Sequence, residues 1–246
     1  MARSAPLDHR SLGIIGFGAF GRLIAEHMRG FVKIHATDAL PIANAPHGVT
    51  PTDLGGVCAC DIVVLAVPVS ELEPLCMQIA PLLRPGALVM DVGSVKVEPA
   101  RIMATLLPRH VSLIATHPLF GPQSIKGGAA GLKLVMCPIR GTDERRIAAF
   151  LRKAMGLRII RATPEEHDRE AAYTQGLTHL IARALLPLEA PRRITTRSFD
   201  LLWEAVSMVR HDAAGVTAAI ENGNPYAMDA RQSFFAEMDS LRQDLG

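Results

Sequence analysis

The sequence LGIIGFGAFGRLIAEHMRG at residues 12–30 joins a short apolar run to three glycines and then to a helical pattern. Gly16, Gly18 and Gly21 follow the pattern G-x-G-x-x-G. In that pattern the first glycine permits a tight turn, the second lets the backbone approach a pyrophosphate, and the third allows a helix to pack closely on a strand. Free amides at the start of a helix attract phosphate. The stretch therefore predicts a strand–turn–helix unit that binds a dinucleotide, with Phe20 of the same loop as a further contact.

An acidic residue, Asp38, ends the second apolar run, 22 positions after Gly16. A carboxylate at this place accepts hydrogen bonds from the ribose hydroxyls of NAD and repels the 2′-phosphate of NADP. The sequence between Lys33 and Val49 contains no Arg or Lys that would receive this phosphate. We therefore expect NAD rather than NADP as the cofactor, with a simple turn residue as the alternative role of Asp38.

Apolar runs alternate with helical patterns through the first 160 residues. The runs cover residues 12–17, 32–38, 61–68, 87–94, 111–117, 132–139 and 157–162. Near-continuous apolar strands of this kind are typical of a mostly parallel sheet covered on both faces. We predict a Rossmann-type, doubly wound α/β domain over residues 1–162, in which residues 41–56 form either a strand or a loop. Ser70 with Glu73, and Thr163 with Glu166, each have the spacing of a helix capping box.

Only helical periodicity follows, so residues 163–246 are predicted to form a small all-helical domain for substrate binding and dimerisation. Along one stripe of a helix in this part lie Gln175, His179 and Arg183, spaced i, i+4 and i+8. Polar groups on an otherwise apolar stripe need partners. Those partners are either a neighbouring helix or subunit, or a substrate in the cleft between the two domains.

Composition excludes several classes of partner. The 246 residues contain 26 Lys and Arg against 24 Asp and Glu, a net charge of +2, which gives no electrostatic basis for binding nucleic acid or a membrane surface. No apolar run is long enough to span a bilayer, and the first residues lack the apolar core of a signal peptide. The four cysteines lack metal-ligand spacing. We expect free thiols, no metal and a cytoplasmic location.

Polar residues follow three of the apolar runs, at the strand ends where doubly wound sheets bind ligands. These positions are Val67-Pro68, Gly93-Ser94-Val95-Lys96 and Thr116-His117-Pro118. We expect Val67 and Pro68 to line the cofactor site and the prolines after His117 to hold that imidazole in place. The ordinary alternatives are a loop histidine at 117, a helix N-cap at Ser94 and a solvated Lys96, which could also neutralise a substrate carboxylate.

Several motifs together resemble the prephenate/arogenate dehydrogenase family of tyrosine biosynthesis. They are IIGFGAFG, DIVVLAVP, DVGSVK, ATHPLFGPQS and TQGLTHLIAR, in this order across nearly the whole chain. The resemblance implies an oxidative decarboxylation, in which the ring carbon bearing the 4-hydroxyl loses hydride to the nicotinamide and the ring carboxylate leaves as CO2. It further implies that His117 takes the hydroxyl proton, that Ser94 helps to hold this hydroxyl, and that His179 contacts substrate or cofactor. The C-terminal helices would build a dimer.

The chain departs from the family pattern in one helix. Many prephenate dehydrogenases carry a Thr-Arg pair there, whereas SFDLLWEAVSMVRHDA at residues 198–213 has none. Arg183, Arg197 or Lys96 could bind the substrate carboxylate instead. An acidic residue in the loop GPQSIKGG would bind the amino group of arogenate, but Gln123 stands there, which argues against arogenate. The motifs GFGAFG, THPLFGP and THLIAR are closer to plant-type arogenate dehydrogenases, which argues for it.

Two other functions share parts of this layout. Hydroxyacid dehydrogenases of the 6-phosphogluconate type and pyrroline-carboxylate reductases also join a Rossmann domain to helices. A dinucleotide-sensing module without turnover is the third possibility. Neither of the two rival enzyme families is expected to contain DVGSVK followed by THPLFGP, as this sequence does.

Overall fold

The computed structural model describes residues 10–122, 124–125, 127–188 and 193–246. Its centre is an eight-stranded sheet with the order β3-β2-β1-β4-β5-β6-β7-β8. The strands are β1 (Ser11–Ile15), β2 (Lys33–Thr37), β3 (Val49–Pro51), β4 (Ile62–Leu65), β5 (Leu88–Asp91), β6 (Ser112–Pro118), β7 (Lys133–Arg140) and β8 (Arg158–Arg161). Neighbouring strands are parallel except for the antiparallel pair β6 and β7. The predicted mostly parallel, doubly wound sheet is confirmed.

Two apolar cores cover the sheet, one on each face. Alternate residues of β4 and β5 enter different cores: Val64 and Met90 belong to one, Val63 and Val89 to the other. On the first face pack α1 (Ala19–Met28) and α5 (Glu144–Met155). On the second face pack α2 (Leu54–Cys58), α3 (Val69–Ile79) and α4 (Val97–Leu106). Burial of both faces explains why these strands are apolar at nearly every position.

The segment 41–56, which the sequence left open, forms β3 and the start of α2. Asp53 caps α2 by accepting a hydrogen bond from the Gly56 amide at 2.8 Å. The capping box expected at Ser70 and Glu73 is wrong. Because α3 begins at Val69 with Pro68 as its N-cap, Ser70 lies inside the first turn and its side chain makes no cap hydrogen bond. The box at Thr163 and Glu166 is confirmed, with both reciprocal hydrogen bonds formed.

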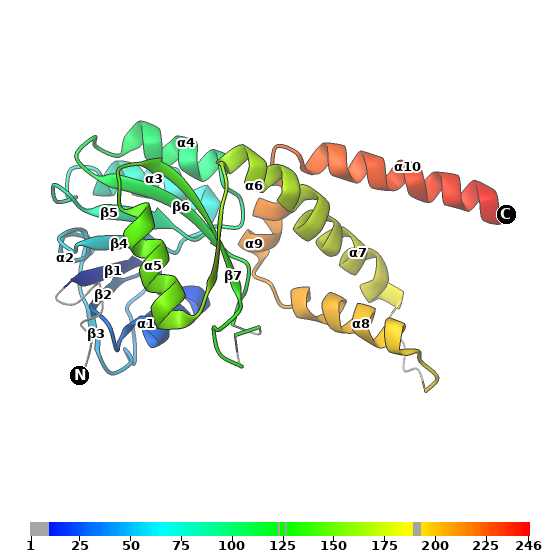
Figure 1. Ribbon diagram of the computed structural model, residues 1–246, viewed down its shortest axis with the longest axis horizontal. Helices are drawn as coiled ribbons and strands as arrows, with labels where there is room; N and C mark the ends of the chain where they lie inside the picture. Colours follow the sequence, from blue (N-terminus) through cyan, green and yellow to red (C-terminus); the bar gives the residue numbers. More distant parts are fainter. Residues whose placement is uncertain (1–9, 123, 126, 189–192) are drawn as a thin grey trace.

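After the last strand, all regular elements of the described residues are helices or helical turns. They are α6 (Pro164–Ala171), the π-helical turn η1 (Ala172–Gly176), α7 (Leu177–Leu185), the 3-10 turn η2 (Leu186–Leu188), α8 (Arg197–Val209), α9 (Ala214–Ala218), the π-helical turn η3 (Ala219–Gly223) and α10 (Ala227–Leu245). Figure 1 shows α10 extending away from the rest of the chain. The change from strands to helices falls between Arg161 and Pro164, although the predicted division into two domains stays a prediction. No helix in the described part of the chain is both long and apolar enough to cross a membrane.

Candidate active site

The glycine-rich loop has the geometry that its sequence pattern requires. Gly16 has a φ of +93°, and a Cβ there would lie 2.3 Å from the carbonyl oxygen of Ala66. A Cβ at Gly21 would lie 2.1 Å from the carbonyl oxygen of Gly16, so the start of α1 packs on the loop. A Cβ at Gly18 would meet no atom within 4 Å. Gly16 and Gly21 are therefore needed for the fold, whereas Gly18 faces open space.

The start of α1 suits a phosphate group. Its N-cap residue is Gly18, no side chain caps the helix, and its first turn contains no acidic residue. The first amides of α1 and the positive end of the helix dipole thus meet the open space at Gly18. These features fit a dinucleotide, whose pyrophosphate binds at such a helix end.

Residues after β2 and β4 surround the same loop. One carboxylate oxygen of Asp38 accepts the Phe17 amide at 2.5 Å, and the other accepts the Leu40 amide at 3.1 Å. A Cβ at Gly16 would come within 3.1 Å of Cγ1 of Val67, and Pro68 follows as the N-cap of α3. The loop, the acid and the Val-Pro pair that the sequence predicted as cofactor contacts are therefore adjacent.

The C-terminal helices approach this edge of the sheet. A Cβ at Gly215 of α9 would lie 3.4 Å from Cβ of Pro68, and one at Gly223 of η3 would lie 3.8 Å from Cγ2 of Val95. The ring of Phe20 in α1 lies 6.5 Å from that of Phe120, which follows β6. The loops after β4 and β5 thus meet the C-terminal helices at the carboxyl ends of the parallel strands, and the residues after β1 and β6 approach each other at the same edge.

Under this edge lies a buried ion pair that the sequence did not predict. The Lys96 ammonium is fully buried and binds the Asp91 carboxylate at 2.5 Å and the Thr116 carbonyl oxygen at 2.6 Å. Asp91 also accepts the amides of Thr116 and Gly93. Lys96 is therefore neither solvated nor free to bind a substrate carboxylate. Its contact with the Thr116 carbonyl instead fixes the backbone immediately before His117.

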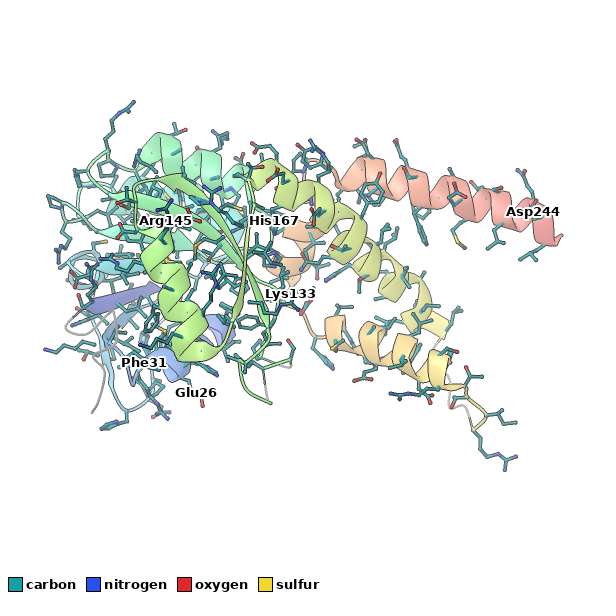
Figure 2. All side chains as sticks on the ribbon, in the orientation of Figure 1. Glu26, Phe31, Lys133, Arg145, His167 and Asp244 are labelled. Carbon is teal, nitrogen blue, oxygen red and sulfur yellow. The ribbon has the colours of Figure 1, made fainter. Side chains whose placement is uncertain are left out.

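A second buried set of polar groups begins at His117 and crosses to α6. Nδ1 of His117 lies 2.8 Å from Nε2 of His167, and Nδ1 of His167 lies 2.7 Å from Oδ1 of Asp168. Asp168 accepts the backbone amides of Lys96 at 2.7 Å and Val97 at 2.9 Å, the first amides of α4. Asn224 donates to the Asp168 carbonyl oxygen at 2.7 Å. Figure 2 labels His167 where the C-terminal helices meet the strands.

The contacts of His117 define its protonation. Burial is the main cause that holds the pKa of His117 well below its usual value of 6.5, and the neighbouring His167 and Lys96 lower it further. The imidazole is therefore neutral at pH 7. No hydrogen bond within the described residues engages its Nε2.

Ser94 lies three residues beyond the end of β5. The register of β5 and β6 pairs Asp91 with Ala115, and the loop that carries Ser94 starts at Asp91 and ends at Lys96, which both contact Thr116. The alternative role of Ser94 as a helix N-cap is excluded, because α4 begins at Val97 with Lys96 at the N-cap position.

The three polar residues of the C-terminal stripe have different environments. Oε1 of Gln175 and Nε2 of His179 are buried without a hydrogen-bond partner in the described part of the chain, although Oδ2 of Asp212 lies 3.3 Å from Nε2 of His179. Arg183 instead pairs with Glu221 at 2.9 Å. Gln123 lies outside the described residues. Gln175 and His179 thus stay candidates for substrate contacts, whereas Arg183 already has a carboxylate partner.

Sequence reasoning missed Asp91, His167, Asp168 and Asn224. The one available signal was a His-Asp pair in the helix after the last strand, within PEEHDREA. The side chains of His167 and Asp168 are buried, although the flanking glutamates indicate a solvent-exposed helix.

The glycine-rich loop, the parallel sheet and the polar strand ends define a Rossmann-type dinucleotide-binding protein. Residues 40–160 match the family model described as "Prephenate dehydrogenase, nucleotide-binding domain". The chain belongs to the prephenate/arogenate dehydrogenase family.

Relatives in sequence support this membership over most of the chain. Arogenate dehydrogenase 1, chloroplastic, of Arabidopsis thaliana is 30% identical over 95% of this chain and 39% of its own length. A probable arogenate/prephenate dehydrogenase of Methanocaldococcus jannaschii is 26% identical over 74% of this chain and 43% of its own length. The chain thus spans less than half of these two relatives. The cyclohexadienyl dehydrogenase of Zymomonas mobilis is 26% identical over 95% of this chain and 87% of its own length.

Solved structures share the fold. The prephenate dehydrogenase of A. aeolicus, in complex with hydroxyphenyl propionate and NAD+, is similar with a TM-score of 0.71 and 20% identity, over 96% of this chain and 91% of that one. Arogenate dehydrogenase of Synechocystis is similar with a TM-score of 0.64 and 22% identity, over 95% of this chain and 91% of that one.

Proposed function

We propose that the protein catalyses the NAD-dependent oxidative decarboxylation of arogenate or prephenate, yielding tyrosine or 4-hydroxyphenylpyruvate. The observation that carries this proposal is the neutral His117 imidazole at the carboxyl edge of the sheet that also carries the glycine-rich loop; its Nε2 has no hydrogen bond to any described residue. A general base for a hydroxyl proton must be unprotonated and within reach of a ligand.

The chain's own residues supply positioning and proton transfer. Bound NAD supplies the acceptor for hydride. His117 accepts the 4-hydroxyl proton at Nε2, and Ser94, in the adjacent loop, holds the same hydroxyl. Gln175 and His179 offer to the other polar groups of the substrate buried polar atoms that have no hydrogen bond within the described residues, although Asp212 lies 3.3 Å from Nε2 of His179. Aromatisation of the ring and release of CO2 drive the reaction, so the protein needs little beyond this positioning.

The structure revises the prediction of which basic residue binds the substrate carboxylate. Lys96 is held by Asp91, and Arg183 is held by Glu221. Arg197 is exposed at the start of α8 and makes no ion pair among the described residues. Figure 1 shows the start of α8, where Arg197 lies, at the end of that helix away from the sheet. None of the three basic residues is therefore assigned to the substrate carboxylate, and we continue to favour arogenate as substrate.

We further infer a preference for NAD, because the Asp38 carboxylate lies beside the phosphate loop, where it repels a 2′-phosphate. A homodimer is supported by the large apolar side chains exposed on α8 and α10, among them Leu202, Phe235 and Leu241.

The four cysteines are buried free thiols, and burial raises the pKa of Cys76 and Cys137 to about 12. Unpaired thiols support a reducing compartment such as the cytoplasm.

The proposal is tested by following the reduced cofactor with purified protein, comparing arogenate with prephenate and NAD with NADP. We expect NADH to form with at least one substrate. The His117→Asn variant should be about 10²–10⁴-fold slower, because a general base usually contributes a factor of this size. Its affinity for NAD should stay unchanged. As a matched control, His110→Asn removes a histidine whose ring contacts the Leu83 carbonyl and should keep the full rate.

Two other results would contradict parts of this proposal. NAD binding without turnover of either substrate would favour a dinucleotide-sensing module. Full activity in His117→Asn would exclude His117 as the proton acceptor.

A further inference from the structure

His117, His167 and Asp168 form a continuous hydrogen-bonded series between two distant parts of the sequence. His117 and His167 are 50 positions apart, and their rings meet edge to face with centroids 5.0 Å apart. His117 is 4% exposed, His167 is 5% exposed and Asp168 is fully buried. Few side chains of this polarity are buried together unless every one of them is hydrogen-bonded.

The direction of each hydrogen bond follows from the acceptor at the end of the series. The Asp168 carboxylate receives two backbone amides from the start of α4 and can only accept from His167. Nδ1 of His167 therefore carries a hydrogen, which leaves a lone pair on Nε2. This lone pair accepts the hydrogen on Nδ1 of His117. The free Nε2 of His117 is then the unprotonated nitrogen.

The same series fixes where a proton goes. When the 4-hydroxyl O–H bond of the substrate breaks, an N–H bond forms at Nε2 of His117. The hydrogen on Nδ1 of His117 can then move to Nε2 of His167. The positive charge comes to rest on His167, whose remaining N–H points at the Asp168 carboxylate. Every proton in this sequence has a donor and an acceptor among the three residues and the substrate.

We propose that His167, oriented by Asp168, is a positioning residue that presents the Nε2 lone pair of His117 to the substrate and accepts the Nδ1 proton of His117. This inference rests on the proposed function for its chemical step, but not for the tautomer of His117. It also gives the C-terminal helices a role in proton transfer, because His167 and Asp168 belong to α6 while His117 belongs to β6.

A purely structural role for the same residues is the competing explanation. Asp168 caps α4, so Asp168→Asn would change folding as well as chemistry. His167 makes no backbone hydrogen bond through its ring in the described residues and is the better position to change. Two substitutions separate the roles: His167→Leu removes the acceptor for His117, whereas His167→Gln keeps an oxygen acceptor but cannot carry the proton onward.

The experiment measures kcat, KM, NAD affinity and thermal midpoint for both variants, with His110→Gln as the matched control. It also records the ¹⁵N signals of the His117 ring at pH 7, which distinguish a protonated from an unprotonated nitrogen. We expect His167→Leu to lower kcat by about 10² or more, within the range of a lost general base, with KM and NAD affinity nearly unchanged. His167→Gln should restore part of this loss, and His110→Gln should change nothing.

The ¹⁵N signals should show wild-type His117 with hydrogen on Nδ1 and none on Nε2, and His167→Leu should lose this preference. Hydrogen on Nε2 in the wild type would overturn the inference, as would a kcat within twofold of wild type in His167→Leu. A loss of kcat that follows the thermal midpoint alone, with the His117 tautomer unchanged, would show a structural role only. If the wild type turned over neither substrate, the proposed function would fail, and the ¹⁵N signals would still decide the positioning of His117.

Discussion

Removing the ammonium of Lys96 tests how the strand end at His117 is stabilised. Lys96→Met keeps the length of the side chain and deletes its charge. The Asp91 carboxylate then stays buried, and the amides of Gly93 and Thr116 are its remaining donors among the described residues. Asp91 is 2% exposed, so solvent cannot replace the lost partner. Breaking a buried ion pair on one side destabilises a protein by about 3–5 kcal/mol, because it leaves an unpaired buried charge.

The second substitution should recover much of this loss. In Lys96→Met/Asp91→Asn neither side chain is charged, and the Asn oxygen can still accept the Thr116 amide. Replacing both members of a buried pair by neutral groups is often close to neutral in free energy. We therefore expect the double variant to be more stable than Lys96→Met, with a coupling energy of about 2 kcal/mol or more between the two positions.

Urea unfolding followed by circular dichroism measures the free energy of unfolding of the four proteins in this cycle. The surface pair Arg84 and Asp61 is the matched control, since its side chains are 46% and 24% exposed and 3.0 Å apart. Its coupling energy should be about 0.2–1 kcal/mol, as for exposed ion pairs. A loss below about 1 kcal/mol in Lys96→Met, or equal coupling energies in the two cycles, would refute the reasoning.

Three further predictions address the titration of His117, the glycine loop and the assembly. The pKa of His117 in the folded protein is held well below the unfolded value near 6.5. Just below pH 6.5 the unfolded chain therefore binds a proton at this residue and the folded protein does not. This group's contribution to the free energy of unfolding should thus be complete above about pH 6.5 and fall as the pH drops below it; urea unfolding against pH measures this, and His117→Asn should flatten that part of the curve. Gly18→Ala should keep the thermal midpoint within a few degrees and weaken NAD binding measured by calorimetry at least tenfold, since its Cβ would enter only the open space. Gly21→Ala should instead lower the thermal midpoint, since its Cβ would clash with the Gly16 carbonyl, and the opposite ranking would contradict the assigned roles. Light scattering should give the mass of a dimer, and Leu202→Asp on α8 should shift it toward a monomer; a monomeric wild type would exclude the dimer.

Local sequence patterns were sufficient for the elements that depend on neighbours in the chain. Near-continuous apolar runs predicted seven of the strands within a few residues, while the short β3 stayed open. Thr163 and Glu166 were recognised because a capping box needs only residues three positions apart. The same rule failed at Ser70, because the N-cap of the helix is Pro68, two residues earlier.

The sequence alone determined the glycine loop, the acid after the second strand, and the histidine at the end of an apolar strand, because each role depends on a few adjacent residues. Only the tertiary structure decided the environment of Lys96, which the sequence placed in solvent or on the substrate and which is instead buried on Asp91. It also brought His167 and Asp168 to His117 across 50 positions of sequence. The physical reason is that burial and hydrogen-bond partners depend on what packs against a side chain, and packing between distant segments leaves no periodic signal in the sequence.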